Sequence, residues 1–157
     1  MQKKRTGTVI KTENWNPAKS VDNAAVRKIA RATLSYLKRR KAAVNIVFVS
    51  DSEIKKLNKC FLNEDCPTDV ISFWQETCDT FRHADKNFLG DIAISTDRAR
   101  VNAGLFGKTY EEEILLYVIH GILHLSGYKD YTVRDRKIME NIQEEILGKF
   151  KKTAQKT

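Results

Sequence analysis

Apolar and polar positions follow one another in patterns that predict nine elements. Short runs rich in β-branched residues predict strands over about 7–12, 43–50, 69–74 and 88–95. Apolar positions at helical spacing predict helices over about 17–40 and 51–61, a short helix ending at Gly104, a longer one from Tyr110, and a last one after Thr132. This order predicts a single α+β (mixed α/β) domain with about four strands in a mixed sheet packed against helices.

Local signals refine several of these elements. Asn16 and Pro17 supply a cap and a first-turn proline for the first helix. Thr109 and Thr132 are each followed three residues later by an acid, the spacing of a capping box. The strand at 43–50 lacks alternation, so we expect it to be buried on both faces. The apolar stripe of the last helix contains Ile138, Ile142, Ile146 and Phe150.

The composition of the 157-residue chain, 41% hydrophobic and 31% charged, is typical of one soluble globular domain. No apolar stretch is long enough to span a bilayer, and the basic N-terminus lacks the apolar core of a secretory signal. We therefore expect no membrane partner. Cys60, Cys66 and Cys78 follow no metal-binding spacing, which favours free thiols in a reducing cytoplasm.

The net charge of +8 is concentrated at the two ends of the chain. Residues 1–41 contain twelve Lys or Arg and two acids, and the tail after Gly148 adds four lysines and no acid. Residues 42–148 contain twelve basic and eighteen acidic residues. The asymmetry suits a polyanionic partner such as nucleic acid, and it equally suits charge that only keeps a helix and a frayed tail (about 149–157) soluble.

Two histidines lie four residues apart in a segment, 114–125, that is apolar on nearly every side. In a buried helix the Cβ atoms of His120 and His124 lie about 5–6 Å apart, which suits two imidazoles that bind one metal ion, as in a zincin-like His-x-x-x-His helix. Gly127 can end the helix with a positive φ, so that the chain folds back and brings Asp130 beside both rings. Two nitrogens, one carboxylate and an open fourth position compose a catalytic zinc site. The alternative is two structural histidines bonded to carbonyls, with Asp130 in a surface turn.

The residue after the first histidine is Gly121, where zinc peptidases of the His-Glu-x-x-His type have their general base. The pattern therefore lacks what a peptidase requires. We expect Gly121 to allow a neighbouring backbone to pack closely against the helix.

Three motifs, "HGILHLSGYKD" (120–130), "LNEDCPTDVISF" (62–73) and "LGDIAIS" (89–95), carry a resemblance to a known family. Together they resemble the YbeY family of bacterial rRNA-maturation endoribonucleases, over most of residues 44–147 and in the same order. The resemblance implies a single-domain metalloprotein, residues 1–157, with one zinc ion per chain on the histidine helix. It also implies cleavage of single-stranded RNA, maturation of the 3′ end of 16S rRNA, and ribosome quality control.

Carried over by position, His120 and His124 match the first two metal ligands of the family. The third family ligand is a histidine, and Asp130 stands in its place; Lys129 stands at the family's aspartate. Leu62 stands where the family usually has an arginine. Aspartate is a legitimate zinc ligand, although its charge makes the metal a weaker Lewis acid. The loss of the arginine removes a phosphate clamp, for which Lys129 compensates in part as a point charge.

The residues of the histidine helix, together with the resemblance to the YbeY family, predict a metal-dependent endoribonuclease of the cytoplasm. His120, His124 and Asp130 are expected to act through the metal and the water that it activates. We expect single-stranded rRNA and the small ribosomal subunit as partners, and possible contacts with ribosome-associated proteins, with the basic first helix and tail holding the RNA backbone. Two alternatives remain: a non-catalytic rRNA-binding assembly factor with a structural metal, and a hydrolase of another phosphate ester or an amide.

Four further polar residues are candidates for the site. Thr68, Asp69 and Ser72, at the start of a strand, are candidates for lining the substrate cleft together with Lys129; the alternative for the first three is a capped turn. Asp91 follows Gly90 in an apolar strand, where a buried carboxylate needs a partner. We expect it to hold a histidine ligand from behind, and the alternative is that it accepts from nearby backbone amides.

The segment around the third predicted strand holds two aromatic residues and a long polar loop. Phe73 and Trp74 are predicted to be core residues, with base stacking as the alternative. The loop from Gln75 to Asn87 is longer than a tight hairpin, which favours a functional rim. His83 within it is predicted to be a surface residue rather than a metal ligand.

Overall fold

The computed structural model describes residues 7–74 and 87–156. Nine elements follow one another in the predicted order of strands and helices, and their bounds are β1 Val9–Asn14, α1 Asn23–Tyr36, β2 Ala43–Val49, α2 Asp51–Leu62, β3 Val70–Trp74, β4 Phe88–Ser95, α3 Thr96–Phe106, α4 Tyr110–Leu125 and α5 Val133–Gln155. The prediction of a single α+β domain with a four-stranded mixed sheet is confirmed.

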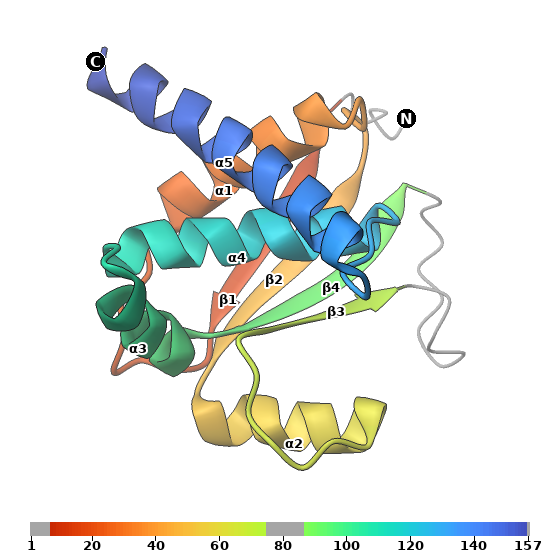
Figure 1. Ribbon diagram of the computed structural model, residues 1–157, viewed down its shortest axis with the longest axis vertical. Coiled ribbons are helices and arrows are strands. Elements are labelled where there is room, and N and C mark those ends of the chain that lie inside the picture. The colour runs from red at the N-terminus through yellow and green to blue at the C-terminus, as the bar shows by residue number, and fades with distance from the viewer. Residues whose placement is uncertain (1–6, 75–86, 157) are drawn as a thin grey trace, which may run out of the picture.

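The four strands lie in the order β1-β2-β4-β3 (Figure 1). β1, β2 and β4 are parallel to one another, and β3 pairs antiparallel with β4. β3 therefore runs back along the edge of the sheet, from the end where β4 finishes to the end where β4 starts.

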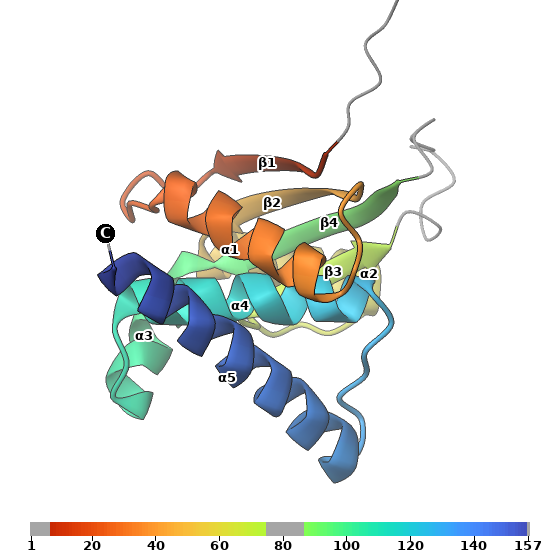
Figure 2. The same cartoon turned by 90° about the horizontal axis from the view of Figure 1, so that it is seen from above.

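Three of the helices, α1, α4 and α5, form two layers on one face of this sheet (Figure 2). α1 and α4 pack on the strands, and α5 crosses the outer side of both (Figure 2). The main core lies between the strands and these helices, where residues such as Ile46, Phe48, Ile92 and Ile119 are almost completely buried. α4 is the central helix of the stack, since it contacts the sheet, α1, α3 and α5.

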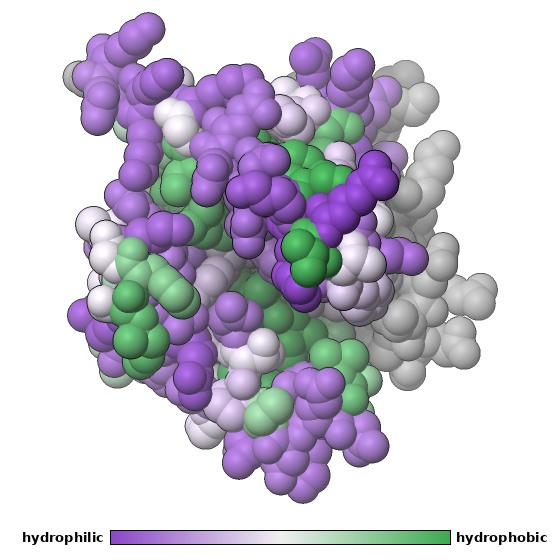
Figure 3. Space-filling view, in the orientation of Figure 1, coloured by the Kyte–Doolittle hydropathy of each residue, from purple (hydrophilic) through white to green (hydrophobic). Residues whose placement is uncertain are grey.

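The opposite face of the sheet is only partly covered. α2 places Ile54 against Val49 and Ile71 in a small second cluster. Side chains of β2 alternate between buried and half-buried in its first half, so the expectation of a strand buried on both faces is wrong there. Among the described helices, none covers that face of the first half of β2. On the surface seen in Figure 3, apolar side chains gather over α3, where Val101, Leu105 and Phe106 are exposed.

Three helix boundaries differ from those expected. α1 begins at the cap Asp22, not at Asn16, because the side-chain amide of Asn16 donates to the Thr96 hydroxyl and holds residues 16–22 in a separate connection. α3 continues past Gly104 and ends at Phe106, with Gly107 as its C-cap. α5 continues to Gln155, so the tail expected to be frayed from about 149 is helical. The caps at Thr109 and Thr132 are confirmed, since each side-chain oxygen accepts from the amide three residues on.

Along residues 7–74 and 87–156, no helix combines the length and the apolar character that crossing a bilayer requires.

Candidate metal centre

α4 brings the two histidines to a fixed place over the sheet. Nearly all of its residues from Glu113 to Leu125 are buried, whereas His120 and His124 are half-buried and face the region between α4 and the start of α5. Gly121 lies on the sheet side of the helix. A Cβ added there would meet Cγ2 of Ile92 at 2.7 Å, so the close approach predicted at this glycine is made by a side chain of β4 rather than by backbone.

The end of α4 reverses the chain as predicted. Gly127 has φ of 99°, a conformation that residues with a Cβ rarely adopt. Its amide donates to the carbonyl of His124, and the amide of Tyr128 donates to the carbonyl of Leu123, both at 3.0 Å. These bonds satisfy the last carbonyls of the helix and direct the following residues back toward the histidines. Asp130 thereby comes beside both imidazole rings.

Three ligand atoms converge at this point. The Nε2 atoms of His120 and His124 are 3.0 Å apart. The Asp130 Oδ2 atom is 3.3 Å from Nε2 of His124 and 3.8 Å from Nε2 of His120. Two ligands bound at about 2.0–2.1 Å from one tetrahedral zinc ion lie about 3.3 Å apart, so the spacing fits a shared ion. Within the described ranges, this is the one group of three or more His, Cys, Asp or Glu residues that could hold a metal.

The other nitrogen of each ring has a partner that determines its tautomer. Nδ1 of His124 lies 2.9 Å from the carbonyl oxygen of Tyr128, which can only accept, so this nitrogen carries the proton. Nδ1 of His120 lies 2.8 Å from Oε1 of Gln143 on α5. Both Nε2 atoms are therefore left with lone pairs directed toward Asp130. Three acceptors facing one another repel unless a cation lies between them, which favours a metal over the alternative of two structural histidines.

The electrostatics of His120 favour the neutral ring that a metal requires. Burial lowers the pKa of His120 from its ordinary value, and the neighbouring His124 lowers it further. The hydrogen bond to Gln143 and the carboxylates of Asp69 and Asp130 act in the opposite direction but do not reverse the change. The side chains of His120, His124 and Asp130 keep 26%, 20% and 38% of their surface exposed, so a substrate has access to the site.

Two contributors were not foreseen from the sequence. Gln143 lies four residues after the buried Met139 and three before the buried Ile146, and a polar residue on that stripe is the signal that could have revealed it. Arg136 donates from Nη1 to the carbonyl oxygen of Asp130 at 3.5 Å. It lies in the first turns of α5, where the helix dipole disfavours a cation, and it has no ion-pair partner within the described part of the chain. Lys129, which precedes Asp130 in the chain, is exposed.

Ser72 contacts the histidine helix directly. Its hydroxyl donates to the carbonyl oxygen of Gly121 at 3.1 Å, which ties the edge strand β3 to α4 one residue from His120. This bond gives Ser72 a role in holding the helix in place.

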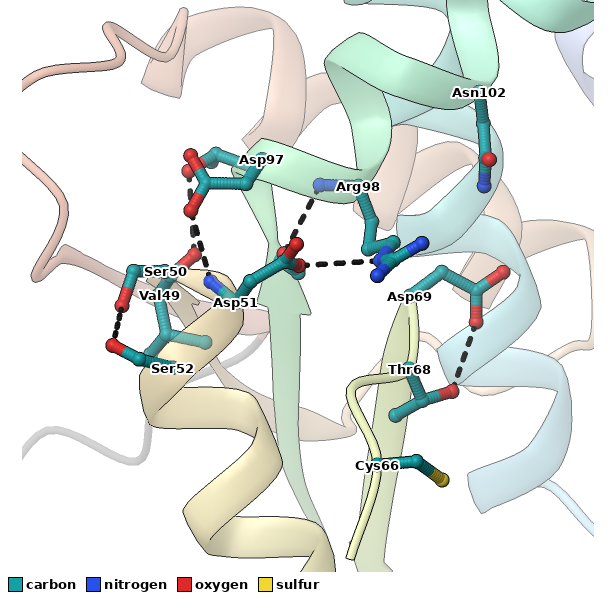
Figure 4. A network of polar contacts seen from close by, with 12 residues as sticks. Val49, Ser50, Asp51, Ser52, Cys66, Thr68, Asp69, Asp97, Arg98 and Asn102 are labelled. Carbon is teal, nitrogen blue, oxygen red and sulfur yellow. Dashed lines mark hydrogen bonds and ion pairs between the residues drawn. The ribbon is translucent and has the colours of Figure 1, made fainter.

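Thr68 and Asp69 make up a capped turn at the start of β3. The carboxylate of Asp69 accepts from the Val70 amide at 2.9 Å and from the Thr68 hydroxyl at 3.4 Å. Figure 4 shows this turn near the ion pair between Asp51 and Arg98, where α2 and α3 begin. These contacts match the capped-turn alternative; among the described contacts, neither side chain touches a metal ligand.

The expectation for Asp91 is wrong. Asp91 is exposed on the partly covered face of the sheet, where its Oδ1 accepts from the side-chain amide of Asn45 at 3.0 Å. Ile92 points to the opposite face, against α4. The carboxylate therefore cannot hold a histidine, because the sheet lies between them. The partner of His120 comes from α5 instead.

The two aromatic residues of β3, both expected in the core, differ in burial. Phe73 is half-buried against the second cluster and meets the ring of Phe61 edge-on at 5.0 Å. Trp74 keeps 43% of its surface exposed, so its assignment to the core is wrong. Leu62 is 56% exposed at the end of α2. His83 and most of the loop expected to be a functional rim lie outside the described residues.

Comparison with known proteins decides the family. The sequence profile described as Endoribonuclease YbeY matches residues 10–151. The chain belongs to the YbeY family. A relative from Pelotomaculum thermopropionicum, Endoribonuclease YbeY, is 35% identical over 139 residues, which is 85% of this chain and 91% of that protein. Another from Acholeplasma laidlawii with the same name is 41% identical over 107 residues, 68% of this chain and 74% of that protein.

A solved structure agrees with the fold. The solution structure of TM1509 from Thermotoga maritima matches with a TM-score of 0.59 and 26% sequence identity, over 96% of this chain and 95% of that one. The resemblance to the YbeY family read from three sequence motifs is thus confirmed.

Proposed function

We propose that this chain is a zinc-dependent endoribonuclease that cleaves single-stranded RNA. The observation that carries the proposal is the convergence of His120 Nε2, His124 Nε2 and Asp130 Oδ2 on one exposed point, in a chain that belongs to the YbeY family. Relatives over most of the chain are named endoribonucleases, which supports hydrolysis of RNA phosphodiester bonds as the reaction.

The donor set supports zinc, one ion per chain. Two imidazole nitrogens and one carboxylate oxygen are the ligand types of catalytic zinc sites, and three protein ligands leave a fourth position for water or substrate. When bound, the ion supplies Lewis-acid activation of the phosphodiester and of the attacking water.

The chain's own residues prepare this site. The Tyr128 carbonyl and the Gln143 side chain hold the Nδ1 protons of His124 and His120, so both Nε2 lone pairs are available. The guanidinium of Arg136, which has no ion-pair partner among the described residues, lies beside Asp130 and donates to its carbonyl oxygen. With the ammonium of Lys129 it provides positive charge for the phosphate that approaches the ligands, in place of the family arginine at Leu62.

We further propose rRNA of the small ribosomal subunit as the substrate, with maturation of the 16S rRNA 3′ end and ribosome quality control as the processes served. Ribosome-associated proteins are proposed as further partners. The net charge of +8 supports a polyanionic partner. Single-stranded RNA exposes its backbone and bases, whereas duplex RNA hides its base edges in a deep groove. A cytoplasmic location fits the free, exposed thiols of Cys60 and Cys66.

The experiment is an incubation of end-labelled single-stranded RNA and of the same sequence as a duplex with purified protein. We expect cleavage of the single strand only, loss of cleavage with a chelator, recovery with added zinc, and no cleavage by a folded His124→Ala variant. Cleavage that persists in His124→Ala would exclude the proposed metal centre from the reaction.

One observation favours a second candidate, an rRNA-binding assembly factor that does not cleave. Leu62 is an exposed apolar side chain at the position of the family arginine. If the wild-type protein binds single-stranded RNA tightly but leaves it intact with zinc, manganese and magnesium alike, this second function is the correct one.

A further inference from the structure

The turn between α1 and β2 carries four consecutive cations, Lys38, Arg39, Arg40 and Lys41, here called the basic turn. They line a surface cavity of about 640 Å³ whose other walls are Ala42, Asn87 and Leu89. All four basic residues are exposed.

The described part of the fold does not neutralise the charges of the basic turn. None of its four side chains has an ion-pair or hydrogen-bond partner within residues 7–74 and 87–156. The tail differs, since Lys149 pairs with Glu145 and Lys151 pairs with Glu112. A concave site with four unpaired cations produces a positive potential that favours a polyanion.

The backbone of Lys38 also departs from what stability alone would select. Its φ is 59°, in the left-handed region, where it closes α1: the Arg39 amide donates to the Leu34 carbonyl at 2.8 Å. Glycine is the favoured residue at this position of a helix end, because a side chain there is strained. A lysine held in this conformation is the kind of local cost that marks a functional site.

The basic turn lies at the same end of the domain as the metal centre. β2 starts at Ala43, which pairs with Phe88 at the start of β4. The end of α4 reaches the same edge of the sheet, since a Cβ on Gly90 would come 2.9 Å from Leu125. In Figures 1 and 2 the α1–β2 connection and the loop from α4 to α5 both lie at the right, whereas the C-terminal end of α5 lies at the left.

We propose that the basic turn binds backbone phosphates of the single-stranded RNA, several nucleotides from the bond at the metal centre. The inference rests on the proposed function for the identity of the substrate. It assigns the RNA grip to this turn and not to the C-terminal lysines, which lie at the far end of α5. The competing explanation is that the cations only complement the negative end of the α1 dipole.

The test compares two variants that lose the same charge. Lys38→Gly with Arg40→Ser changes the basic turn, and Lys152→Ser with Lys156→Ser changes the far end of α5. Binding of a fluorescent 12-nucleotide 2′-O-methyl RNA to the zinc-loaded proteins is measured by anisotropy from 50 to 300 mM salt, and a gel checks that the RNA stays intact. Cleavage of unmodified RNA is measured in parallel as KM and kcat.

Each contact to a phosphate of single-stranded RNA contributes about 0.7 to the magnitude of the slope of log affinity against log salt concentration. At 0.1 M salt this corresponds to about a fivefold gain in affinity per contact. We expect the turn variant to bind about 25-fold more weakly with a slope smaller by about 1.4, through a higher KM. The RNA affinity of the tail variant should stay within about twofold of the wild-type affinity. Lys38→Gly alone should bind about fivefold more weakly although its melting temperature is equal or higher, which excludes unfolding as the cause.

Equal losses in the turn and tail variants, or none in the turn variant, would overturn the inference. The outcome is separable from that of the proposed function. If the wild-type protein binds RNA through the turn but does not cleave it, the inference about the basic turn stands and the proposed endonuclease function is wrong. If the wild-type protein cleaves RNA and the turn variant binds and cleaves it equally well, the proposed endonuclease function stands and the inference about the basic turn is wrong. Absence of both binding and cleavage removes both.

Discussion

Replacing Gln143 by leucine removes the acceptor that holds the His120 ring. The Oε1 to Nδ1 distance is 2.8 Å, so a full hydrogen bond is lost. Without metal, the imidazole can move its proton from Nδ1 to Nε2, so that no N–H group is left without a partner on the Nδ1 side. With metal bound, Nε2 is occupied and the Nδ1 proton is left without a partner. The cost therefore falls on the metal-bound state and lowers affinity for the ion.

The size of this effect follows from the burial of the ring. A fully buried unsatisfied donor costs about 1–3 kcal/mol, and the lower half of that range applies here because water reaches part of the ring. His120 keeps 26% of its side-chain surface exposed. A cost of about 1.4 kcal/mol is tenfold in affinity, which agrees with the roughly 10–100-fold effect typical of residues that orient metal ligands.

Competition titration with a zinc-binding dye measures the affinity. We expect Gln143→Leu to bind zinc about tenfold more weakly, and Gln143→Glu to bind it more tightly, because a carboxylate acceptor makes the imidazole a stronger donor to the metal. Asn141→Leu, on the exposed side of the same helix, is the matched control. Equal zinc affinity in wild type, Gln143→Leu and Gln143→Glu would refute the role assigned to this side chain.

Three other substitutions test neighbouring contacts. Gly121→Ala places a methyl carbon 2.7 Å from Cγ2 of Ile92. We expect chemical denaturation to show a free energy of unfolding lower by about 1–2 kcal/mol. Ile92→Ala should destabilise the Gly121→Ala protein less than it destabilises the wild type. Additive effects would contradict this contact. Gly127→Ala forces a residue with a Cβ into φ of 99°, which should lower the free energy of unfolding by about 1–2 kcal/mol. The strain should also displace Asp130 and weaken zinc binding. Unchanged zinc affinity would disprove this coupling between the turn and the metal centre. Arg136→Ala should raise KM for single-stranded RNA about fivefold at 0.1 M salt without changing zinc affinity; an unchanged KM would remove Arg136 from substrate binding.

The histidine helix and its reversal were predictable because their signals are local. The apolar run, the cap at Thr109 and the positive φ of Gly127 depend on residues within a few positions of one another. Asp130 then has a short connection through which to reach the rings. Such short-range patterns survive in the structure because packing of α4 against the sheet and α5 agrees with them.

The remaining errors come from contacts between distant segments. Gln143 is 23 residues from His120, so its role depends on how α5 crosses α4. Asp91 was misassigned because nothing in β4 itself reveals that α2 covers only part of the second face. Asn16 has the sequence of a helix cap, but its side chain instead reaches Thr96, 80 residues away. In each case a tertiary partner outweighed a plausible local reading.

A zinc titration of the wild-type protein beside an Asp130→Ala variant, with bound metal quantified per chain, examines the convergence of the three ligands most directly. The geometry predicts one zinc ion per wild-type chain. Loss of a residue that only orients a metal ligand lowers metal affinity about 10–100-fold, so removal of the Asp130 carboxylate, a ligand itself, should lower zinc affinity by at least that factor. Stoichiometric zinc held with equal affinity by both proteins would contradict a site built from His120, His124 and Asp130.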